Sequence, residues 1–317
     1  MLKVTVVAIT YARPDHLAAL LESFLRLEGM EAHDLTFVVV DNDAARSAER
    51  VVAALAERDA RFVYVPEPKK GIPVARNRGL DEAIRSGSDV LCFVDDDEVV
   101  DPKWLAELLA RFQQGGAEMV GGPVLVGPLV SQSTRWQRLV HASLAQRARR
   151  KALKTAQDAK TRNKFTIVTN NWLADLAWLT KTGVRFDEEK FRYSGGSDTA
   201  FYRAFKFAGG KGAWNPNAVV YETVMSERLS LSYQMRRGRA QSANHYRMKH
   251  KALSVQLALS TVLIAMVRFI LGAMLLVVPV FGMASPVMAV RSMGWALGRI
   301  DGMLGTHPAL YEKPETS

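Results

Sequence analysis

The chain has 317 residues, a formal net charge of +10 and 48% hydrophobic residues. This length allows one large α/β domain plus an appendage, and the apolar content excludes a wholly disordered or collagen-like chain. The single cysteine, Cys92, excludes a disulfide scaffold and a cysteine-cluster metal site within one chain. The positive charge points to an anionic partner, which is nucleic acid, a phosphorylated ligand or an acidic lipid surface.

The N-terminal part alternates between apolar β-branched runs and helical patterns. The start, MLKVTVVAIT, is too short an apolar run for a signal peptide, so we expect it to be a strand of a chain that starts in the cytoplasm. The predicted strands are Lys3–Thr10, Leu35–Val40, Phe62–Val65 and Val90–Val94. A first helix is predicted from the spacing of Leu17, Leu20, Leu21 and Phe24. Two further helices are predicted over Ala44–Arg58 and Val74–Ser86. This order predicts a mostly parallel sheet covered by helices on both faces.

Ligands of such sheets bind at the carboxyl ends of the strands, where Asp41 and Asp95 lie. The chain has neither G-x-G-x-x-G after the first strand nor a P-loop, so a nucleotide has to be held in another way.

A basic segment occupies 131–164, with ten Lys and Arg residues against Asp158 alone. Its apolar residues are interspersed, so it is either a helix on an anionic membrane or a solvated insertion that covers the site. Further on, the sequence predicts a helix over Thr199–Ala208, a strand over Ala218–Val224 and a basic helix over Leu229–Lys251.

The C-terminal part, 252–290, is uncharged except for Arg268, and carries Pro279, Gly282 and Pro286. About 20 apolar residues span a bilayer as a helix. Four interpretations stay open, namely a single span, a hairpin that dips into one leaflet and breaks near Pro279, surface helices, and a buried soluble helix pair. Basic residues at both ends favour the hairpin. The last dozen residues look like a polar tail.

An acidic run, one further aspartate and a segment with an arginine and an asparagine are candidate catalytic or binding residues. Asp95-Asp96-Asp97-Glu98 follow a buried strand, and such oxygen ligands suit Mg²⁺ or Mn²⁺, although they also suit a solvated turn that caps a helix. Asp198 follows two glycines and is either a helix cap or a general base. Arg76 and Asn77 lie near a helix start and either meet a nucleotide or, for Arg76, pair with Asp81 or Glu82.

In combination these features resemble the family 2 glycosyltransferases with a GT-A fold. The matching elements, in the family's order, are Thr10-Tyr11, Val40-Asp41-Asn42, Gly71…Ala75-Arg76-Asn77…Gly79-Leu80, Asp95-Asp96-Asp97 and Gly195-Gly196-Ser197-Asp198. The resemblance covers 1–239, so we expect a GT-A domain there, with 131–164 as an insertion that contacts membrane or acceptor. It implies that 240–317 is a helical, membrane-associating region similar to that of bacterial exopolysaccharide and cell-envelope members, including succinoglycan-type transferases.

The resemblance implies a role for each matching residue. Tyr11, Asp41 and Arg76 would hold the nucleotide base, and Thr10 would also belong to the nucleotide site. Asp95 would reach the ribose or a metal-bound water, and Asp97, together with Asp95, would form the Mn²⁺ or Mg²⁺ site. Asp198 would be the general base of an inverting transfer from a nucleotide sugar, most often UDP-linked, to a polyprenyl-diphosphate-linked saccharide at the cytoplasmic face of the bacterial inner membrane.

The sequence departs from the family pattern in two ways. Ser197 stands where many members have Glu, and there is no Gln-x-x-Arg-Trp motif. Arg228, Arg236 and Arg237 are the nearest candidates for a diphosphate contact. The missing motif favours addition of one sugar per event. Two other functions are kept as alternatives, a nucleotidyltransferase with a strand-end Asp metal site and a non-catalytic basic scaffold that binds membrane or nucleic acid; the glycosyltransferase resemblance implies no nucleic-acid partner.

Overall fold

The computed structural model describes residues 1–129, 132–161, 165–168, 170–192, 196–250, 254–277 and 285–306. The chain divides into two compact units, described separately below. The first unit comprises Met1–Gly127 and Ala148–Thr223, and the second comprises Pro128–Arg147 and Val224–Ser317.

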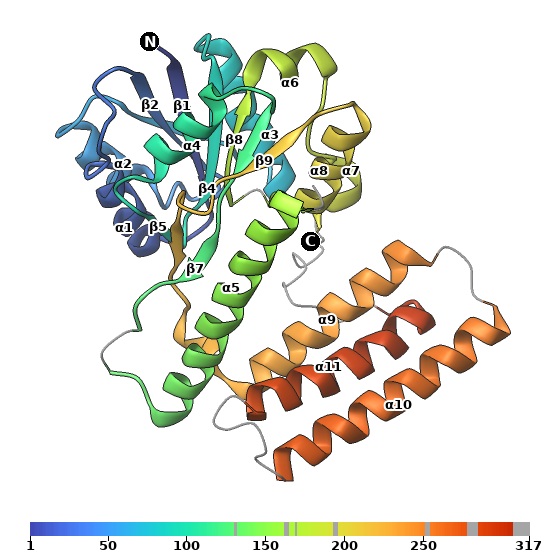
Figure 1. Ribbon diagram of the computed structural model, residues 1–317. Coiled ribbons are helices and arrows are strands. Elements are labelled where there is room, and N and C mark those ends of the chain that lie inside the picture. Colours follow the sequence, from blue (N-terminus) through green and yellow to red (C-terminus); the bar gives the residue numbers. More distant parts are fainter. Residues whose placement is uncertain are drawn as a thin grey trace. The chain divides into compact units, whose positions relative to one another are not determined.

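The first unit is built on a seven-stranded sheet in the order β3-β2-β1-β4-β8-β6-β9 (Figure 1). The strands are β1 (Lys3–Thr10), β2 (Asp34–Asp41), β3 (Phe62–Pro66), β4 (Val90–Asp95), β6 (Met119–Gly121), β8 (Asn171–Asp175) and β9 (Gly212–Trp214). Only β8 runs antiparallel to its neighbours. A second sheet joins β5 (Glu98–Val100), β10 (Val220–Glu222) and β7 (Val124–Val126). The predicted α/β class with a mostly parallel sheet is therefore confirmed.

Two apolar layers cover the sheet, because successive side chains of a strand point to opposite faces. Val4, Val6 and Ala8 of β1 belong to the core that includes α1 and α4, whereas Val7 belongs to the core on the other face, with α3 and α8. The helices of this unit are α1 (Pro14–Phe24), α2 (Glu49–Ala56), α3 (Ile72–Arg85), α4 (Trp104–Gln113), α6 (Leu176–Thr182), α7 (Glu188–Phe191) and α8 (Ser197–Phe207). On α3, Gly79 allows close packing, since a Cβ there would lie 2.4 Å from Val7 Cγ1.

The first four predicted strands agree with the structure, but α2 is shorter than the predicted helix over Ala44–Arg58. The reason is the acidic pair at the end of β2. Asp41 accepts hydrogen bonds from the backbone N–H groups of residues 43 and 48, and Asp43 accepts one from residue 45. Side chains that capture backbone donors in this way compete with helix formation, so α2 begins only at Glu49.

The basic segment forms one long helix, α5 (Arg135–Thr161), which passes from the second unit into the first. The second unit also contains a 3₁₀ turn, η1 (Ser226–Leu229), and three helices, α9 (Leu231–Lys249), α10 (Val255–Val277) and α11 (Ser285–Leu304). Within the second unit, α9 packs on α11. The predicted boundary between a domain over 1–239 and a region over 240–317 stays a prediction.

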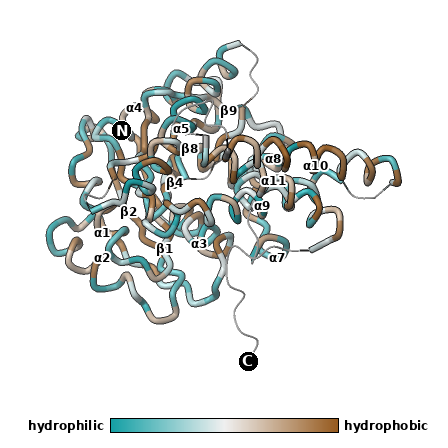
Figure 2. Tube along the Cα trace, turned by 90° about the horizontal axis from the view of Figure 1, so that it is seen from below, coloured by the Kyte–Doolittle hydropathy of each residue, from teal (hydrophilic) through white to brown (hydrophobic). Residues whose placement is uncertain are grey.

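Helix α10 is apolar, as its brown colour in Figure 2 shows. Most of its side chains are exposed, since 17% of its apolar stretch is buried. In the described part of the chain it is the one helix whose length and composition would allow it to cross a membrane, over Val255–Leu276 with a mean hydropathy of 2.2. A narrow face of α10, which includes Thr261 and Ala265, is buried. Pro279 and Gly282, where a hairpin break was predicted, and the polar tail after Thr306 lie outside the described residues.

Candidate functional site

The acidic turn after β4 is held by polar side chains of the β1 end. Thr10 Oγ1 donates to Asp96 Oδ2 at 2.8 Å. Arg13 Nη1 lies 3.2 Å from Asp96 Oδ1 and 3.5 Å from Asp97 Oδ2. Because β1 and β4 are parallel neighbours, their carboxyl ends meet at one edge of the sheet. Thr10 therefore supports the acidic turn, and Arg13 supplies a positive charge there that no sequence motif indicated.

Arg76 connects this turn to the beginning of α8. It is 7% exposed, and its Nη2 lies 3.3 Å from Asp95 Oδ1 while its Nη1 donates to Ser197 Oγ at 3.3 Å. The guanidinium also lies over the Phe186 ring, at 5.5 Å from the centroid. The alternative pairing of Arg76 with Asp81 or Glu82 is not observed, because those acids pair with Arg185 and with Arg78 and Arg85.

Asp198 lies in the first turn of α8, next to the Ser197 that Arg76 holds. Gly196 is the N-cap residue, in a left-handed conformation with φ of 111°, so Asp198 does not cap the helix. Its side chain is half-buried. A carboxylate in the first turn of a helix is stabilised by the helix dipole. Gly195 lies outside the described residues.

Asn77 explains how the chain segment before α8 is positioned. Its Oδ1 accepts from the backbone N–H of Phe186, and its Nδ2 donates to the Phe186 carbonyl and to Glu188 Oε1. Glu188 also accepts from Lys69 Nζ at 2.9 Å. Asn77 therefore joins α3 to the start of α7. No local pattern in the sequence indicates its partner Glu188, because the two residues are 111 positions apart.

Asp41 is fully buried at the end of β2. Its two oxygens accept from two backbone N–H groups and from Tyr64 Oη at 3.0 Å. Asn42 next to it bonds the loop before α3, through the carbonyls of Glu67 and Lys69 and the N–H of Gly71. These contacts shape the loops around the expected base site, and the predicted contact of Asp41 with a base stays a prediction.

Tyr11 stands in the open part of the same edge. It is 45% exposed, and Lys70 Nζ donates to its Oη at 3.0 Å and lies 4.5 Å from its ring centroid. An exposed ring of this kind offers a face on which a planar base can stack.

Glu98 is the most deeply buried acid of the cluster. It is 1% exposed, and it accepts from the backbone N–H of Asp95 at 3.0 Å and from Asn170 Nδ2 at 2.9 Å. Burial, and next the charge of Asp95, raise the pKa of Glu98 well above its usual range. Burial likewise raises the pKa of Asp95 to about 6, with Arg76 opposing and Asp97 and Asp96 adding to the rise.

The variant Glu98→Gln is expected to gain stability relative to the wild type as the pH rises from about 5 to 8 in the presence of EDTA. The raised pKa means that the folded protein retains a proton that the unfolded chain releases above its own pKa of 4.5. The wild type therefore loses up to about 1.4 kcal/mol per pH unit from this group in that range, and the amide does not.

Urea unfolding of both proteins at several pH values measures this difference. Asn170 can accept the substitution, because its Oδ1 is buried without a partner among the described residues and an amide flip would present it to a donor. A stability difference that stays constant with pH would contradict the raised pKa.

The acids of this turn fit a hard divalent cation by their chemistry. Mg²⁺ is commonly held by one or two carboxylates together with water and substrate phosphates. Asp95 and Asp97 offer two carboxylates at one strand end, where a bound cation would offset the repulsion between their like charges. Among the described residues no group of three or more acids, histidines or cysteines is arranged to hold an ion by itself.

Arg228, Arg236 and Arg237 belong to the second unit, in η1 and α9. The structure therefore does not assign them to the acidic turn, and their diphosphate contact stays a prediction. Arg236 is exposed and Arg237 is half-buried.

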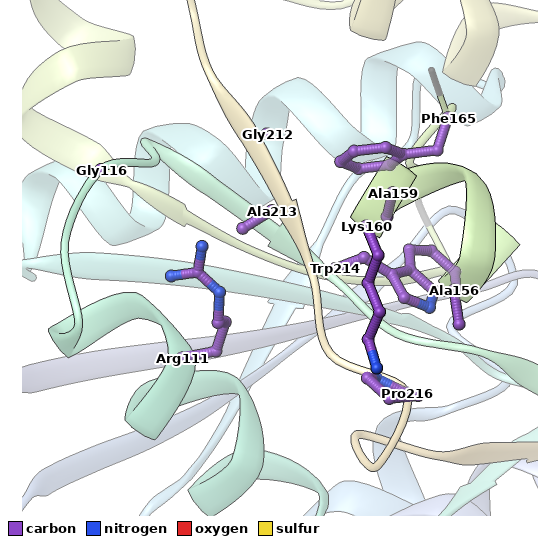
Figure 3. Close-up of a pocket in the computed structure, with 10 residues that line it drawn as sticks. All are labelled: Arg111, Gly116, Ala156, Ala159, Lys160, Phe165, Gly212, Ala213, Trp214 and Pro216. Atoms are coloured by element: carbon purple, nitrogen blue, oxygen red, sulfur yellow. The ribbon is translucent and has the colours of Figure 1, made fainter. Parts of the chain in front are cut away.

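A separate pocket lies beside β9 at the edge of the sheet (Figure 3). Phe165 and Trp214 meet edge to face there, with ring centroids 6.3 Å apart, and Arg111 and Lys160 add positive charge. None of the residues predicted for the site lines this pocket.

The fold and the strand-end acids together define a GT-A-like α/β protein, and comparisons with known proteins agree. Over 96% of this chain and 92% of the other, the fold is similar to that of S. aureus TarS 1-349, with TM-scores of 0.51 for TarS alone, 0.50 with UDP and 0.52 with UDP-GlcNAc. Sequence identity is 12–14%, so this likeness concerns the fold.

The sequence matches Glycosyl transferase family 2 over residues 5–181. It is also 34% identical over 244 residues to the succinoglycan biosynthesis protein ExoM of Rhizobium meliloti (strain 1021), which covers 75% of this chain and 72% of ExoM. The chain belongs to glycosyl transferase family 2, and the resemblance found in the sequence is confirmed.

Proposed function

We propose that this glycosyltransferase moves one sugar per event, with inversion, from a UDP-linked donor to a lipid-linked saccharide in exopolysaccharide or cell-envelope synthesis. The transfer reaction takes place at the cytoplasmic face of the bacterial inner membrane. The family match favours a glycosyltransferase over the two alternatives, a nucleotidyltransferase and a non-catalytic scaffold.

The observation that carries the proposal is the contact of Arg76 with both Asp95 and Ser197. It links the strand end that would receive the donor to the first turn of the helix that carries Asp198. A single displacement requires the donor and the base to be held in one orientation, and this buried guanidinium supports both the strand end and the helix start.

Asp198 is the general base of this step. The acceptor hydroxyl oxygen forms a bond to the anomeric carbon, the bond from that carbon to the diphosphate oxygen breaks on the opposite side, and the hydroxyl proton passes to Asp198. One displacement of this kind inverts the configuration, so an α-linked donor yields a β-linkage. A positioned base contributes about 10²–10⁴-fold in rate.

Asp97 and Asp95 would hold Mn²⁺ or Mg²⁺, which as a Lewis acid would stabilise the charge of the leaving diphosphate. Arg13, which lies beside Asp97, adds a positive charge on the same side. On the nucleotide side, the exposed Tyr11 ring would stack on the base, and Thr10, Asp41 and Arg76 would complete this end of the site. A UDP donor is supported by the UDP and UDP-GlcNAc complexes of the similarly folded TarS.

The lipid-linked acceptor is supported by the second unit. Apolar α10 exposes most of its length, and α5 is rich in basic residues, which suits a surface with anionic lipids. The succinoglycan biosynthesis role named for the relative supports a cell-envelope or exopolysaccharide product. The absence of Gln-x-x-Arg-Trp from the sequence supports addition of one sugar per event.

The first test is binding of UDP, GDP, CDP and dTDP to the purified protein with Mn²⁺ and with EDTA. We expect UDP to bind best with Mn²⁺, and Asp97→Ala to weaken that binding by about 10- to 100-fold, a range typical of lost support at a metal site. In EDTA the variant and the wild type should bind UDP equally.

The matched control is Asp101→Ala, which removes the same charge four residues further along the chain. Among the residues that the structure describes, its carboxylate accepts from the N–H of Lys103, so UDP binding should be unchanged. Failure of all four nucleotides to bind, or an equal effect of both variants, would overturn the proposed donor site.

A further inference from the structure

Helices α9 and α11 of the second unit pack backbone against backbone. A Cβ on Gly238 would lie 3.0 Å from the Arg291 carbonyl oxygen, and a Cβ on Gly294 or Gly298 would lie 2.2 or 2.0 Å from carbonyl oxygens of α9. The ion pair of Arg239 with Asp301, at 2.6 and 2.8 Å, closes the other end of the contact. This tight packing fixes where Arg291 lies on α9.

Arg291 is clamped on a polar face of α9. Its Nη1 donates to Gln234 Oε1 at 2.6 Å and its Nη2 to Gln241 Oε1 at 3.3 Å. Arg237 lies three residues after Gln234 and four before Gln241, so it shares this helical face. Two guanidinium groups are therefore placed side by side, although like charges repel.

A third guanidinium, from Arg147 of α5, belongs to the same cluster. Burial, and then the charges of Arg147 and Arg237, lower the pKa of Arg291 to about 10. All three causes act in the same direction, and none of them is the charge of a carboxylate. Arg147 is exposed and Arg237 and Arg291 are half-buried, which leaves the cluster open to a ligand on the Arg147 side.

Such a cluster suits a multiply charged phosphate ligand. Guanidinium forks bind phosphate oxygens with two parallel hydrogen bonds, and they are less strongly hydrated than ammonium groups. The three positive charges of the cluster exceed the single negative charge of a phosphodiester headgroup. They match the two or three negative charges of a diphosphate ester more closely. The same unit contains exposed, apolar α10, which packs on α11, so the phosphate is expected to come with a lipid (Figure 1).

We infer that Arg147, Arg237 and Arg291 bind the diphosphate of the lipid-linked acceptor. This inference rests on the proposed transfer to such an acceptor and adds the residues that recognise its head. It retains Arg237 from the three arginines that the sequence suggested for a diphosphate, and it assigns that arginine to the acceptor and not to the donor.

The test is flotation of the full chain with phosphatidylcholine vesicles that contain either undecaprenyl diphosphate or phosphatidylglycerol at equal surface charge. We expect the wild type to bind the diphosphate vesicles more tightly. Arg147→Ala and Arg237→Ala should each weaken binding to them by about 10- to 100-fold, because each removes a charge-assisted hydrogen bond. Binding to phosphatidylglycerol vesicles should change by less than threefold.

The matched control is Arg50→Ala, which removes an exposed arginine of α2 in the first unit. Arg147→Ala is the decisive variant, since an exposed side chain can be removed without disturbing the α9–α11 packing. Equal effects of Arg147→Ala, Arg237→Ala and Arg50→Ala would overturn the site. Equal weakening on both kinds of vesicle would assign the cluster to phospholipid headgroups and overturn the diphosphate assignment.

Nucleotide binding separates this inference from the proposed function. The two cluster variants should bind UDP with Mn²⁺ as the wild type does. If the wild type did not bind UDP, the proposed donor site would be overturned. If the variants bound UDP normally and their binding to diphosphate vesicles were also unchanged, the lipid diphosphate site alone would be overturned.

Discussion

The variant Asp198→Asn is expected to lower the rate of sugar transfer by about 10²–10⁴-fold, because the amide cannot accept the proton of the acceptor hydroxyl. UDP-sugar binding should change by less than about twofold, since Asp198 lies on α8 while the base and diphosphate would lie near the ends of β1, β2 and β4. Transfer is measured with a labelled donor, and binding by calorimetry in the presence of Mn²⁺.

Asp15→Asn is the matched control for this variant. Asp15 also lies in the first turn of a helix, α1, and is exposed, so the same loss of charge near a helix dipole costs at most about 1 kcal/mol of stability and should leave transfer intact. If Asp198→Asn kept full turnover, the base would have to be another group. If it lost donor binding as well as turnover, Asp198 would belong to the donor site.

The triple variant Leu259→Asp, Leu263→Asp, Met266→Asp is expected to release the protein from membranes into the soluble fraction. These three side chains of α10 are 67%, 59% and 55% exposed, so the changes should leave the packing of the second unit intact. A charged residue at the centre of a bilayer costs about 2.5–3.5 kcal/mol of insertion free energy. Three such residues should therefore be enough to move the partitioning of α10 from the membrane to water.

The control places three acids on exposed positions of the first unit, through Ala53→Glu, Ala54→Glu and Gln114→Glu. It should stay with the membrane fraction. Continued sedimentation of the α10 variant with membranes would mean that α10 is not the anchor, and it would move that role to the basic helix α5. Circular dichroism of both proteins checks that helix content is unchanged.

The acidic turn illustrates how much of the site local sequence can predict. Asp95 and Asp97 follow a buried strand, so their place at the edge of the sheet follows from strand length and the parallel order. No motif pointed to Arg13, and Glu98 stood out in the sequence only as the last acid of this run. Their roles depend on partners that the fold brings to them, namely Asp96 and Asp97 for Arg13, and Asn170 for Glu98.

Asp41 and Arg76 show the opposite case, in which a predicted residue has neighbours that sequence spacing does not reveal. Asp41 is enclosed by Tyr64 and by two backbone donors, and Arg76 reaches Ser197, which is 121 positions further along the chain. Short-range alternatives, such as an Arg76 pair with Asp81, looked equally good in the sequence. The structure decides between them, because helix α3 turns Arg76 toward the sheet and leaves Asp81 to Arg185.

The sequence by itself determined the α/β class, the first four strands, the family and the apolar nature of the C-terminal part. These depend on hydrophobic periodicity and on motifs within a few residues, which a chain carries before it folds. Only the tertiary structure decided that α9 pairs with α11, that Arg147, Arg237 and Arg291 gather into one cluster, and that Arg76 joins Asp95 to the start of α8. Such contacts join residues that lie far apart in the sequence, for example 121 positions for Arg76 and Ser197. They form only because packing of the apolar faces fixes where each helix lies.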